Sequence, residues 1–325
     1  MNNNIKFRKK FKNLVRVICV NLWTVIFLVG FLTPTQGQQY DPLYTQYMFN
    51  SLSLNPGYAG TSGLLSAMLL SRHQWVGFDN APNTQTFSIH SPIASTNTGL
   101  GFSMIYDHLG PIVNTNFSLD YAFRFRISEN VKMSLGLKGA IAYFQRDLSQ
   151  FFNEVGNDHV YYEKIDPKVL PNFGFGVYCY GDKFYAGASI PRLIENTISD
   201  DGAESLFTKK ENRMYMLMSG AVIDAGSTFK FKPSFLLRLS NTAPVSIDLN
   251  VNMLISEMVW VGAMFRPKEA YGALLQVQVT NQFRVGYAFE MNYNIMMSHH
   301  KGTHEIMLNF DFIFRKENIQ NPRYF

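Results

Sequence analysis

Residues 113–145, VNTNFSLDYAFRFRISENVKMSLGLKGAIAYFQ, alternate between apolar and polar side chains in two successive runs. The first run covers 113–127 and the second covers 131–145, with Ser-Glu-Asn at 128–130 between them. Because successive side chains of a β-strand point to opposite faces, each run predicts a strand with one apolar and one polar face. The stretch therefore predicts a long β-hairpin with a tight turn.

The length of these two strands helps to decide between two all-β architectures. Each has about 15 residues, whereas strands of soluble proteins usually have about 5–6. A half-buried hairpin of a soluble sandwich is the alternative. The strand length favours a transmembrane antiparallel β-barrel, in which apolar side chains face lipid and polar side chains face the lumen.

Similar alternation recurs across residues 63–315, where we expect about fourteen strands. The expected connections also alternate in length, because 128–130 and 181–182 are short whereas 146–169 and 191–211 are long. Outer-membrane barrels have short periplasmic turns and longer outer loops. The pattern favours an outer-membrane barrel over a soluble sandwich, and an even strand number predicts that both termini are periplasmic.

The two ends of the chain lie outside the predicted barrel. Residues 1–37 have the features of a secretory signal peptide, with a basic segment followed by an apolar run at 17–32 that is short for a bilayer span. An uncleaved anchor is the alternative. Residues 38–62 carry Pro and Gly in place of a strand pattern, so we expect them to plug the barrel or to line its periplasmic mouth. Residues 316–325 would form a periplasmic tail.

Composition excludes several other classes of protein. Hydrophobic residues make up 46% of the chain, and no run of about 18 apolar residues follows the signal peptide, which excludes helical membrane spans. The net charge of +5 comes from the signal peptide, so nothing in the remaining chain points to nucleic acid. Cys179 is the only cysteine beyond it, which leaves no intrachain disulfide and no thiolate metal site.

Catalytic and metal-binding motifs are also missing from the sequence. His299, His300, His304 and Glu305 crowd one outer region, but their spacing matches no standard metal site, and a solvated polar loop is the simpler interpretation. There is no nucleophile elbow, phosphate loop or zinc-protease motif. We therefore expect a protein that is not an enzyme, with no catalytic residues, no cofactor, no bound metal and no small-molecule substrate.

Polar side chains on the inward-facing positions of the strands carry both charge signs. Charges are costly towards lipid but are accepted in a wet or paired lumen. Two interpretations remain open, namely a paired polar core that rigidifies the barrel and a solute channel without strong ion selectivity. The polar residues expected to face the lumen include Asp120, Arg124, Arg126, Lys132, Lys138, Arg238, Asp248, Arg284, Glu290 and Asp311.

Several short phrases occur in order along the chain after the signal peptide. They include DPLYTQYMFN at 41–50, NPGYAG at 55–60, RHQWVGF at 72–78, THEI at 303–306 and NPRYF at 321–325. Each phrase is weak alone, but their order and spacing are specific. Together they resemble the PorP/SprF family of type IX secretion system membrane proteins from Bacteroidetes.

The resemblance implies an outer-membrane β-barrel that works with the type IX machinery. Members are associated with gliding motility and with the secretion or surface attachment of large adhesins. Some pair with one secreted protein through the C-terminal domain of that protein, and others contact rings in the periplasm. The family has no established catalytic residues, so none are transferred here. A FadL-like or porin-like uptake channel is the alternative function.

The topology offers two docking surfaces for such partners. The long outer loops carry aromatic and aliphatic side chains typical of interface hot spots, and Asp166-Pro167 in one of them predicts a turn. The periplasmic alternative uses 38–60 and the tail 316–325 to contact the machinery. The outer-loop residues expected to hold a secreted partner are Phe151, Phe152, Tyr161, Tyr162, Ile194 and Phe207.

Overall fold

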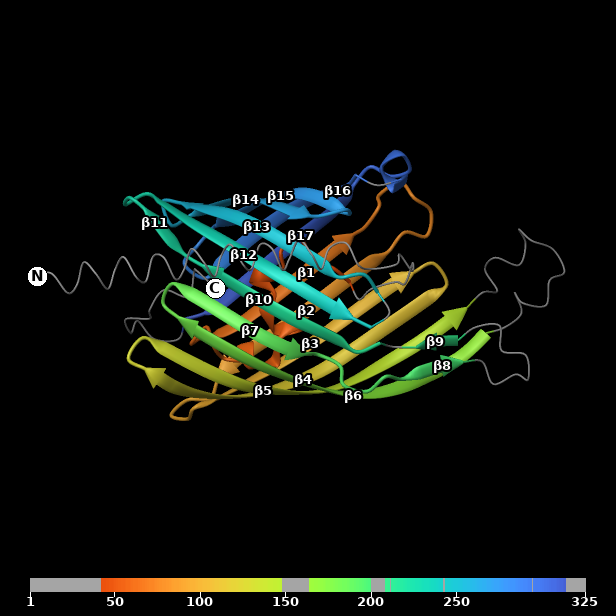
Figure 1. Cartoon of the computed structure of the whole chain (residues 1–325), viewed down its shortest axis with the longest axis horizontal. Coiled ribbons are helices and arrows are strands. Elements are labelled where there is room, and N and C mark those ends of the chain that lie inside the picture. The colour runs from red at the N-terminus through yellow and green to blue at the C-terminus, as the bar shows by residue number, and fades with distance from the viewer. Residues whose placement is uncertain are drawn as a thin grey trace, which may run out of the picture.

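The computed structural model describes residues 42–147, 164–199, 208–210, 212–241, 243–293 and 295–313. Within these residues, fourteen antiparallel strands close into a barrel (Figure 1). Each strand pairs with its neighbour along the chain, and β1 pairs with β17 over the whole of β1, which closes the barrel. The wall is formed by β1 (Leu65–His73), β2 (Asn83–Pro92), β3 (Thr98–Leu109), β4 (Ile112–Ser128), β5 (Val131–Asp147), β6 (Lys164–Gly181), β7 (Phe184–Ile190), β10 (Met214–Ala221), β11 (Ile223–Ala225), β12 (Phe229–Ser240), β13 (Ser246–Ile255), β14 (Val259–Arg266), β15 (Ala270–Gln278), β16 (Phe283–Asn292) and β17 (Thr303–Phe312).

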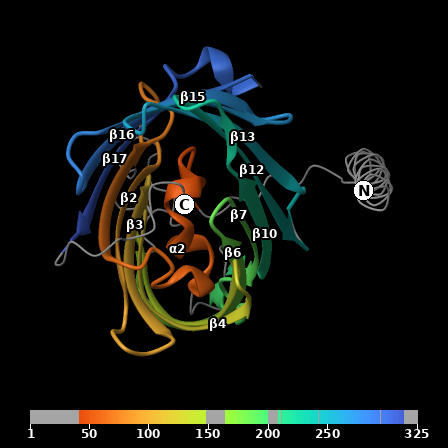
Figure 2. The same ribbon diagram turned by 90° about the vertical axis from the view of Figure 1, so that its left-hand side faces the viewer.

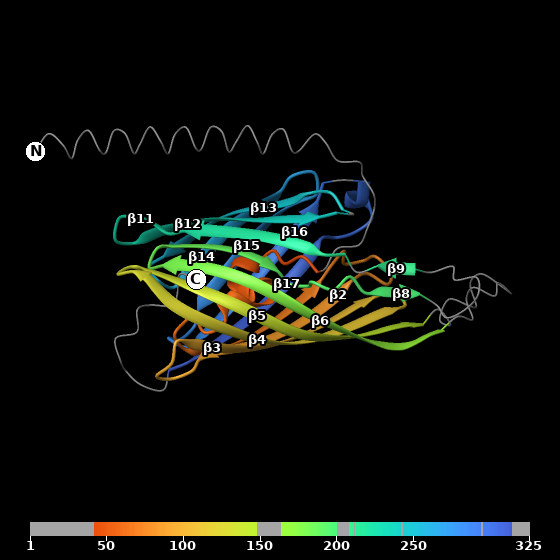
Figure 3. The ribbon, with the colours of Figure 1, turned by 60° about the horizontal axis from the view of Figure 1, so that its bottom comes forward.

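The short elements β10 and β11 form a single crossing of this wall. Both pair with β12 without a change of register. Only Val222 separates them, and by this register Pro233 of β12 lies opposite Ala221, next to the break. Proline has no N–H to donate to a strand ladder. A separate two-stranded ribbon, β8 (Thr197–Ser199) with β9 (Thr208–Lys210), lies beyond one mouth of the barrel (Figure 3).

Side chains along the strands alternate between the lipid face and the lumen, as the hairpin 113–145 predicts. Leu119 of β4 and Leu137 of β5 are 66% and 59% exposed on the outer wall. Asp120, which follows Leu119 in β4 and points the other way, is only 1% exposed. In the described part of the chain, no helix is long and apolar enough to cross a membrane. The alternation therefore places apolar side chains on the outside of the wall and polar ones within.

The two mouths of the barrel differ in their connections. At one mouth, here called the turn end, the strands are joined by tight turns such as 129–130, 182–183 and 256–258. The other mouth, the loop end, carries the long connections, including 191–213. The expected separation of short and long connections is incomplete, because the short turn 110–111 also lies at the loop end.

Strand β6 extends further towards the loop end than the sequence predicts. Strand β6 has 18 residues, whereas β7 beside it has 7 and pairs only with the turn-end half of β6. Pro167 and Pro171 lie in the half of β6 that β7 does not cover, where a missing N–H costs no ladder hydrogen bond. The turn predicted at Asp166-Pro167 is therefore wrong, because these residues continue β6, which pairs with β5 on one edge and has no neighbouring strand on the other.

An irregular segment, 42–63, fills the lumen and is called the plug (Figure 2). It contains three short turns of helix, η1 (Tyr47–Phe49), α2 (Ser51–Leu54) and η2 (Pro56–Tyr58). Proline at the first position of η2 loses nothing, because that N–H would have no helical partner. Several plug side chains are fully buried against the wall, among them Tyr47, Met48 and Leu52.

Candidate functional site

The plug crosses the lumen from the loop end towards the turn end. Near its start, the backbone N–H of Thr45 donates to Glu305, which lies close to the loop end of β17 (2.7 Å). Near its finish, the N–H of Gly60 donates to Nδ1 of His90, close to the turn end of β2 (3.2 Å). The segment then continues into β1. The plug therefore occupies most of the height of the barrel.

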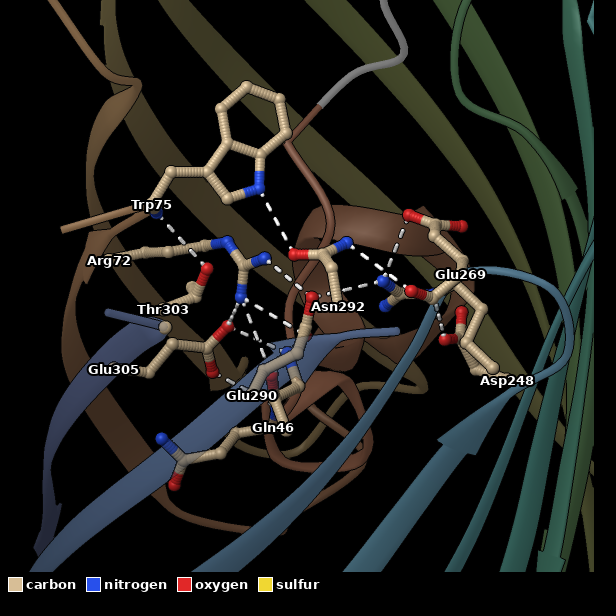
Figure 4. Close-up of polar contacts among 12 residues, drawn as sticks. Gln46, Arg72, Trp75, Asp248, Glu269, Glu290, Asn292, Thr303 and Glu305 are labelled. Atoms are coloured by element: carbon tan, nitrogen blue, oxygen red, sulfur yellow. Dashed lines mark hydrogen bonds and ion pairs between the residues drawn. The ribbon is translucent and has the colours of Figure 1, made fainter. Parts of the chain in front are cut away.

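Six charged side chains form a continuous chain of ion pairs on the inner wall near the loop end. Figure 4 labels Arg72, Glu305, Glu290 and Asp248 among them. Arg72 binds Glu305 at 2.5 Å and Glu290 at 3.2 Å. Arg266 binds Glu290 at 3.2 Å and Asp248 at 2.5 Å. Asp248 also binds Arg238 at 2.6 Å. This charge belt consists of Arg72, Glu305, Glu290, Arg266, Asp248 and Arg238, from β1, β17, β16, β14, β13 and β12.

The belt holds the loop-end half of the plug. Both carboxylate oxygens of Glu305 accept backbone N–H groups, from Thr45 at 2.7 Å and from Gln46 at 3.1 Å. The hydroxyl of Thr45 donates to Glu290 at 2.7 Å. Buried charges are stable only when they are paired and their remaining hydrogen-bonding positions are filled. The plug backbone fills several of these positions, so plug and belt depend on each other.

The turn-end half of the plug lies against glycines of the inner wall. A Cβ atom added to Gly136 would stand 2.1 Å from the backbone nitrogen of Gly57, and one added to Gly99 would stand 2.3 Å from the carbonyl oxygen of Ala59. Gly176 is equally close to the plug, through Oδ1 of Asn55 at 2.1 Å. Any larger residue would collide with the plug. We call Gly99, Gly136 and Gly176 the glycine bed.

Asn55 anchors this half of the plug by hydrogen bonds. Its side-chain oxygen accepts from the N–H of Gly57 at 2.8 Å. Its amide nitrogen donates to the carbonyl of Val177 on β6 at 3.0 Å and to that of Ala188 on β7 at 3.3 Å. A single plug side chain therefore satisfies groups on two wall strands and one plug turn.

Phe49, in the middle of the plug, packs between cations of the wall. Nζ of Lys232 lies 4.7 Å from its ring centre, and the guanidinium carbon of Arg284 lies 5.6 Å from it. Both distances are within the range of cation–π attraction. The ring of Trp260 also meets Phe49 edge-on at 5.9 Å.

The RHQWVGF phrase begins in β1 with Arg72 and His73, and residues 74–78 form a rim loop above the belt. Trp75 donates from its indole nitrogen to Asn292 at 3.1 Å and from its backbone to Thr303 at 3.2 Å. Val76 exchanges two backbone hydrogen bonds with the connection before β17, which fixes the loop to that strand pair. The loop therefore closes over the end of the belt, as Figure 4 shows for the indole ring.

A model of the family described as type IX secretion system membrane protein PorP/SprF matches residues 36–310. The chain belongs to the PorP/SprF family. The match and the barrel together identify an outer-membrane β-barrel of the type IX secretion system. No curated protein matches the chain.

Solved structures similar to this PorP/SprF protein are outer-membrane and transport proteins of very different sequence. The toluene transporter TbuX of Ralstonia pickettii is 6% identical, with a TM-score of 0.49 over 82% of this chain and 94% of that one. A FadL homologue of Pseudomonas aeruginosa is 10% identical, with a TM-score of 0.47 over 81% and 94% of the two chains. Omp33 of Acinetobacter baumannii is 9% identical, with a TM-score of 0.43 over 77% and 100%.

The lumen-facing residues nominated from the sequence fall into different environments in the PorP/SprF barrel. Arg238 and Asp248 belong to the belt. Asp120 and Lys138 form a separate buried ion pair at 3.3 Å. Arg126 is exposed at the turn end, outside the enclosed lumen, and so is Lys132 opposite it.

The remaining nominated residues contact the plug or the turn-end half of the wall. Arg124 donates to the carbonyl of Gly60 at 2.5 Å and so holds the end of the plug. Arg284 contacts Phe49, as described above. Asp311 accepts from the hydroxyl of Ser66 at 2.7 Å and joins the last strand to the first.

The outer-loop residues nominated for partner binding lie mostly outside the described residues. This applies to Phe151, Phe152, Tyr161, Tyr162 and Phe207. Ile194 is described, and its side chain is 39% exposed while Asn172 of β6 holds its backbone by two hydrogen bonds. Its exposed side chain on a fixed backbone is compatible with a contact surface.

Sequence reasoning missed three members of the belt as lumen residues. Arg72 lies in LSAMLLSRH, where Met68 and Leu70 also face inward, so no polar alternation marks that strand. Glu305 and Arg266 lie near strand ends, where a charged residue suggests solvent. That both side chains point into the lumen could have been inferred by extending the alternation of β14 and β17 to the strand ends. In the part of the chain that the structure describes, no group of three or more His, Cys, Asp or Glu side chains is arranged to hold a metal ion.

Proposed function

We propose that this barrel is a closed docking subunit, which supports secretion or surface anchoring of a partner protein, such as an adhesin or a gliding protein, from its loop end. The single observation that carries the proposal is the plug. It fills the lumen and is bonded to the wall at both ends and in its middle. A barrel whose lumen is occupied in this way is suited to binding a partner at its mouth.

The plug also argues against the uptake-channel alternative. A solute path would require the plug to leave its contacts with the charge belt, which would leave buried carboxylates and guanidinium groups without hydrogen bonds. The mixed charges of the belt are already paired with each other. The proposal therefore assigns the belt a structural role in holding the plug.

In this proposal, the loop end faces the cell exterior and the turn end faces the periplasm. Long outer loops and short periplasmic turns are the usual arrangement of outer-membrane barrels. Periplasmic components of the machinery would then meet the turn-end rim and the tail 316–325. Residues 42–60 are a poor surface for them, because the plug side chains are largely buried.

The first test is affinity purification of the full-length protein from the outer membrane of the producing cell. We expect a large secreted protein to co-purify, and we expect this to stop when residues 148–163 and 200–207 are replaced by short Gly/Ser turns. These replacements leave the observed ends of β5, β6, β8 and β9 intact. Retention of the partner by the loop-exchanged barrel would contradict docking through these loops.

The second test measures conductance of the purified barrel in planar bilayers. A closed docking subunit should show no stable single-channel steps with the plug in place. Steady conductance of the unmodified protein, together with growth dependence on a transported solute, would support the channel instead.

A further inference from the structure

The outer wall carries a groove across β17, β1, β2 and β3, in the half of these strands nearest the loop end. Its volume is about 300 Å³, roughly ten times the ~30 Å³ that one water molecule occupies in the liquid. The small side chain of Ser71 lies between larger ones, Tyr106 of β3 on one side and Ile306 of β17 on the other. Leu69 and Phe87 line the part nearer the turn end. The groove therefore has room for several methylene groups of a lipid acyl chain.

Polar side chains lie directly beyond the groove, towards the loop end. His73 of β1 and His304 of β17 are opposite each other in register, and Asn83 of β2 lies on the other side of His73. They point outward, because Leu69 and Ile306 on the same face of their strands are 52% and 50% exposed. We call Asn83, His73 and His304 the polar row.

Each histidine of the polar row has one ring nitrogen engaged and one open. Nε2 of His73 is hydrogen-bonded to Oγ of Ser71 at 3.1 Å, and Nδ1 of His304 is hydrogen-bonded to the hydroxyl of Tyr287 at 2.7 Å. Among the described residues, the second nitrogen of each ring has no hydrogen-bond partner. An imidazole nitrogen donates or accepts according to its tautomer. The row therefore offers two oriented positions to a polar ligand outside the wall.

The opposite side of the barrel has no such row at its loop end. Near the loop ends of β12, β13 and β14, the outward positions hold Leu239, Leu249 and Phe265. Polar side chains that face lipid tails are costly. The polar row therefore marks a sector of the wall that meets a polar group as well as acyl chains, and a single amphiphile on this sector supplies both.

The charges near the polar row favour an anionic headgroup. The described strands β16, β17, β1 and β2 have no acidic side chain on their outward face, because Glu290, Glu305 and Asp311 all point inward. Lys301, three residues before His304, is exposed at the rim. Ring N–H groups and an ammonium group are donors that suit the oxygens of a phosphate.

We infer that the groove and the polar row bind one lipid of the loop-end leaflet, with an acyl chain in the groove and a phosphorylated headgroup on His73 and His304. Lipid tails are as apolar as the groove, so the headgroup contacts supply the selectivity. The inference goes beyond the proposed function and does not depend on it, because the site lies on the outer wall and includes neither the outer loops nor the plug.

The test uses native mass spectrometry of the full-length barrel purified in detergent. The probes are lipid A, which is a phosphorylated lipid, and the same lipid after removal of its phosphates. We expect one lipid A per barrel, bound about tenfold more tightly than the dephosphorylated form, because charge-assisted hydrogen bonds are lost with the phosphate.

Two variants separate the groove from the polar row. Ser71→Trp fills the groove and should weaken binding of both lipids about tenfold. The double change His73→Leu with His304→Leu should abolish the preference for the phosphorylated form. Ala273→Trp, on the lipid face of β15, is the control and should bind as the unmodified barrel does. Heat-modifiable migration in gels verifies that each barrel is folded.

Three results would overturn the inference. Equal binding of the two lipids by the unmodified barrel would mean ordinary boundary lipid only. Unchanged binding by a folded Ser71→Trp barrel would remove the groove from the site. A dimer that is lost in the Ser71→Trp variant, without bound lipid, would assign the groove to a second copy of the chain. If Ser71→Trp does not fold, the double histidine variant decides, and an undiminished preference for the phosphorylated lipid would overturn the site.

Discussion

The two halves of the plug are held in different ways. The loop-end half is bound by charge, because the carboxylates of Glu305 and Glu290 accept hydrogen bonds from Thr45 and Gln46 while pairing with arginines. The turn-end half is bound by close fit to the glycine bed and by the hydrogen bonds of Asn55 to the carbonyl groups of Val177 and Ala188. One half depends on paired charges that must all be satisfied, and the other depends on backbone hydrogen bonds and on the absence of wall side chains beneath it.

The difference shows why a segment with little regular structure can hold one conformation. A buried polar network fixes which groups meet, since each unsatisfied charge is costly. A glycine surface fixes how closely two backbones approach, since any added carbon collides. Together with the apolar packing of Tyr47, Met48 and Leu52 against the wall, they hold the plug at both ends.

Removing one carboxylate of the belt should have the largest effect. Glu305→Leu leaves Arg72 without one of its two partners and leaves two plug N–H groups without an acceptor, so we expect about 3–5 kcal/mol of destabilisation. The folded fraction can be followed by heat-modifiable migration against urea. The control is Glu257→Leu, which removes the half-exposed rim pair with Lys230 and should cost less than about 1 kcal/mol. Equal effects of the two changes would show that the belt is not a special anchor.

Adding a side chain to the glycine bed should have the next largest effect. Gly136→Val forces the plug away from β5, and overpacking of this kind costs about 1–3 kcal/mol or more. We expect the barrel to leak a large antibiotic while still reaching the outer membrane. Gly139→Val, three residues along the same strand, meets open space on the lipid face and serves as the control. A sealed Gly136→Val barrel would contradict close fit as the means of holding this half.

Replacing the aromatic ring between the two halves should have the smallest effect. Phe49→Leu removes the cation–π contacts with Lys232 and Arg284, and we expect about 0.5–2 kcal/mol of destabilisation in urea. Phe49→Tyr keeps the ring and should retain most of the stability. A tyrosine variant as unstable as the leucine variant would point to packing volume in place of the cations.

The barrel itself could be predicted because period-two alternation is a local signal. The hairpin 113–145 contains its own turn and both faces of the wall, so the sequence there specifies the two strands, their register and which side chains point outward. The ends of the strands were harder to predict. The sequence Asp166-Pro167 suggested a turn, and only the shortness of β7 shows that β6 has one free edge there, where a proline can be accommodated.

The anchors of the plug could not be predicted because they join residues far apart in the chain. Glu305 meets Thr45 across 260 positions, and neither residue is unusual in its local sequence. The glycines of the bed also look like ordinary weak positions within strands. Their role depends on which segment lies against them, which alternation alone does not indicate.

The closure of the wall by β1 and β17 has a consequence for how the molecule assembles. The plug immediately precedes β1, whereas its loop-end acceptors Glu290 and Glu305 lie on the last two strands. Ordering of the plug therefore waits for the end of the chain, and contacts this distant in sequence form slowly. The open sheet must gather the plug as it curls, so sealing of the barrel and ordering of its interior should occur in one late, cooperative step.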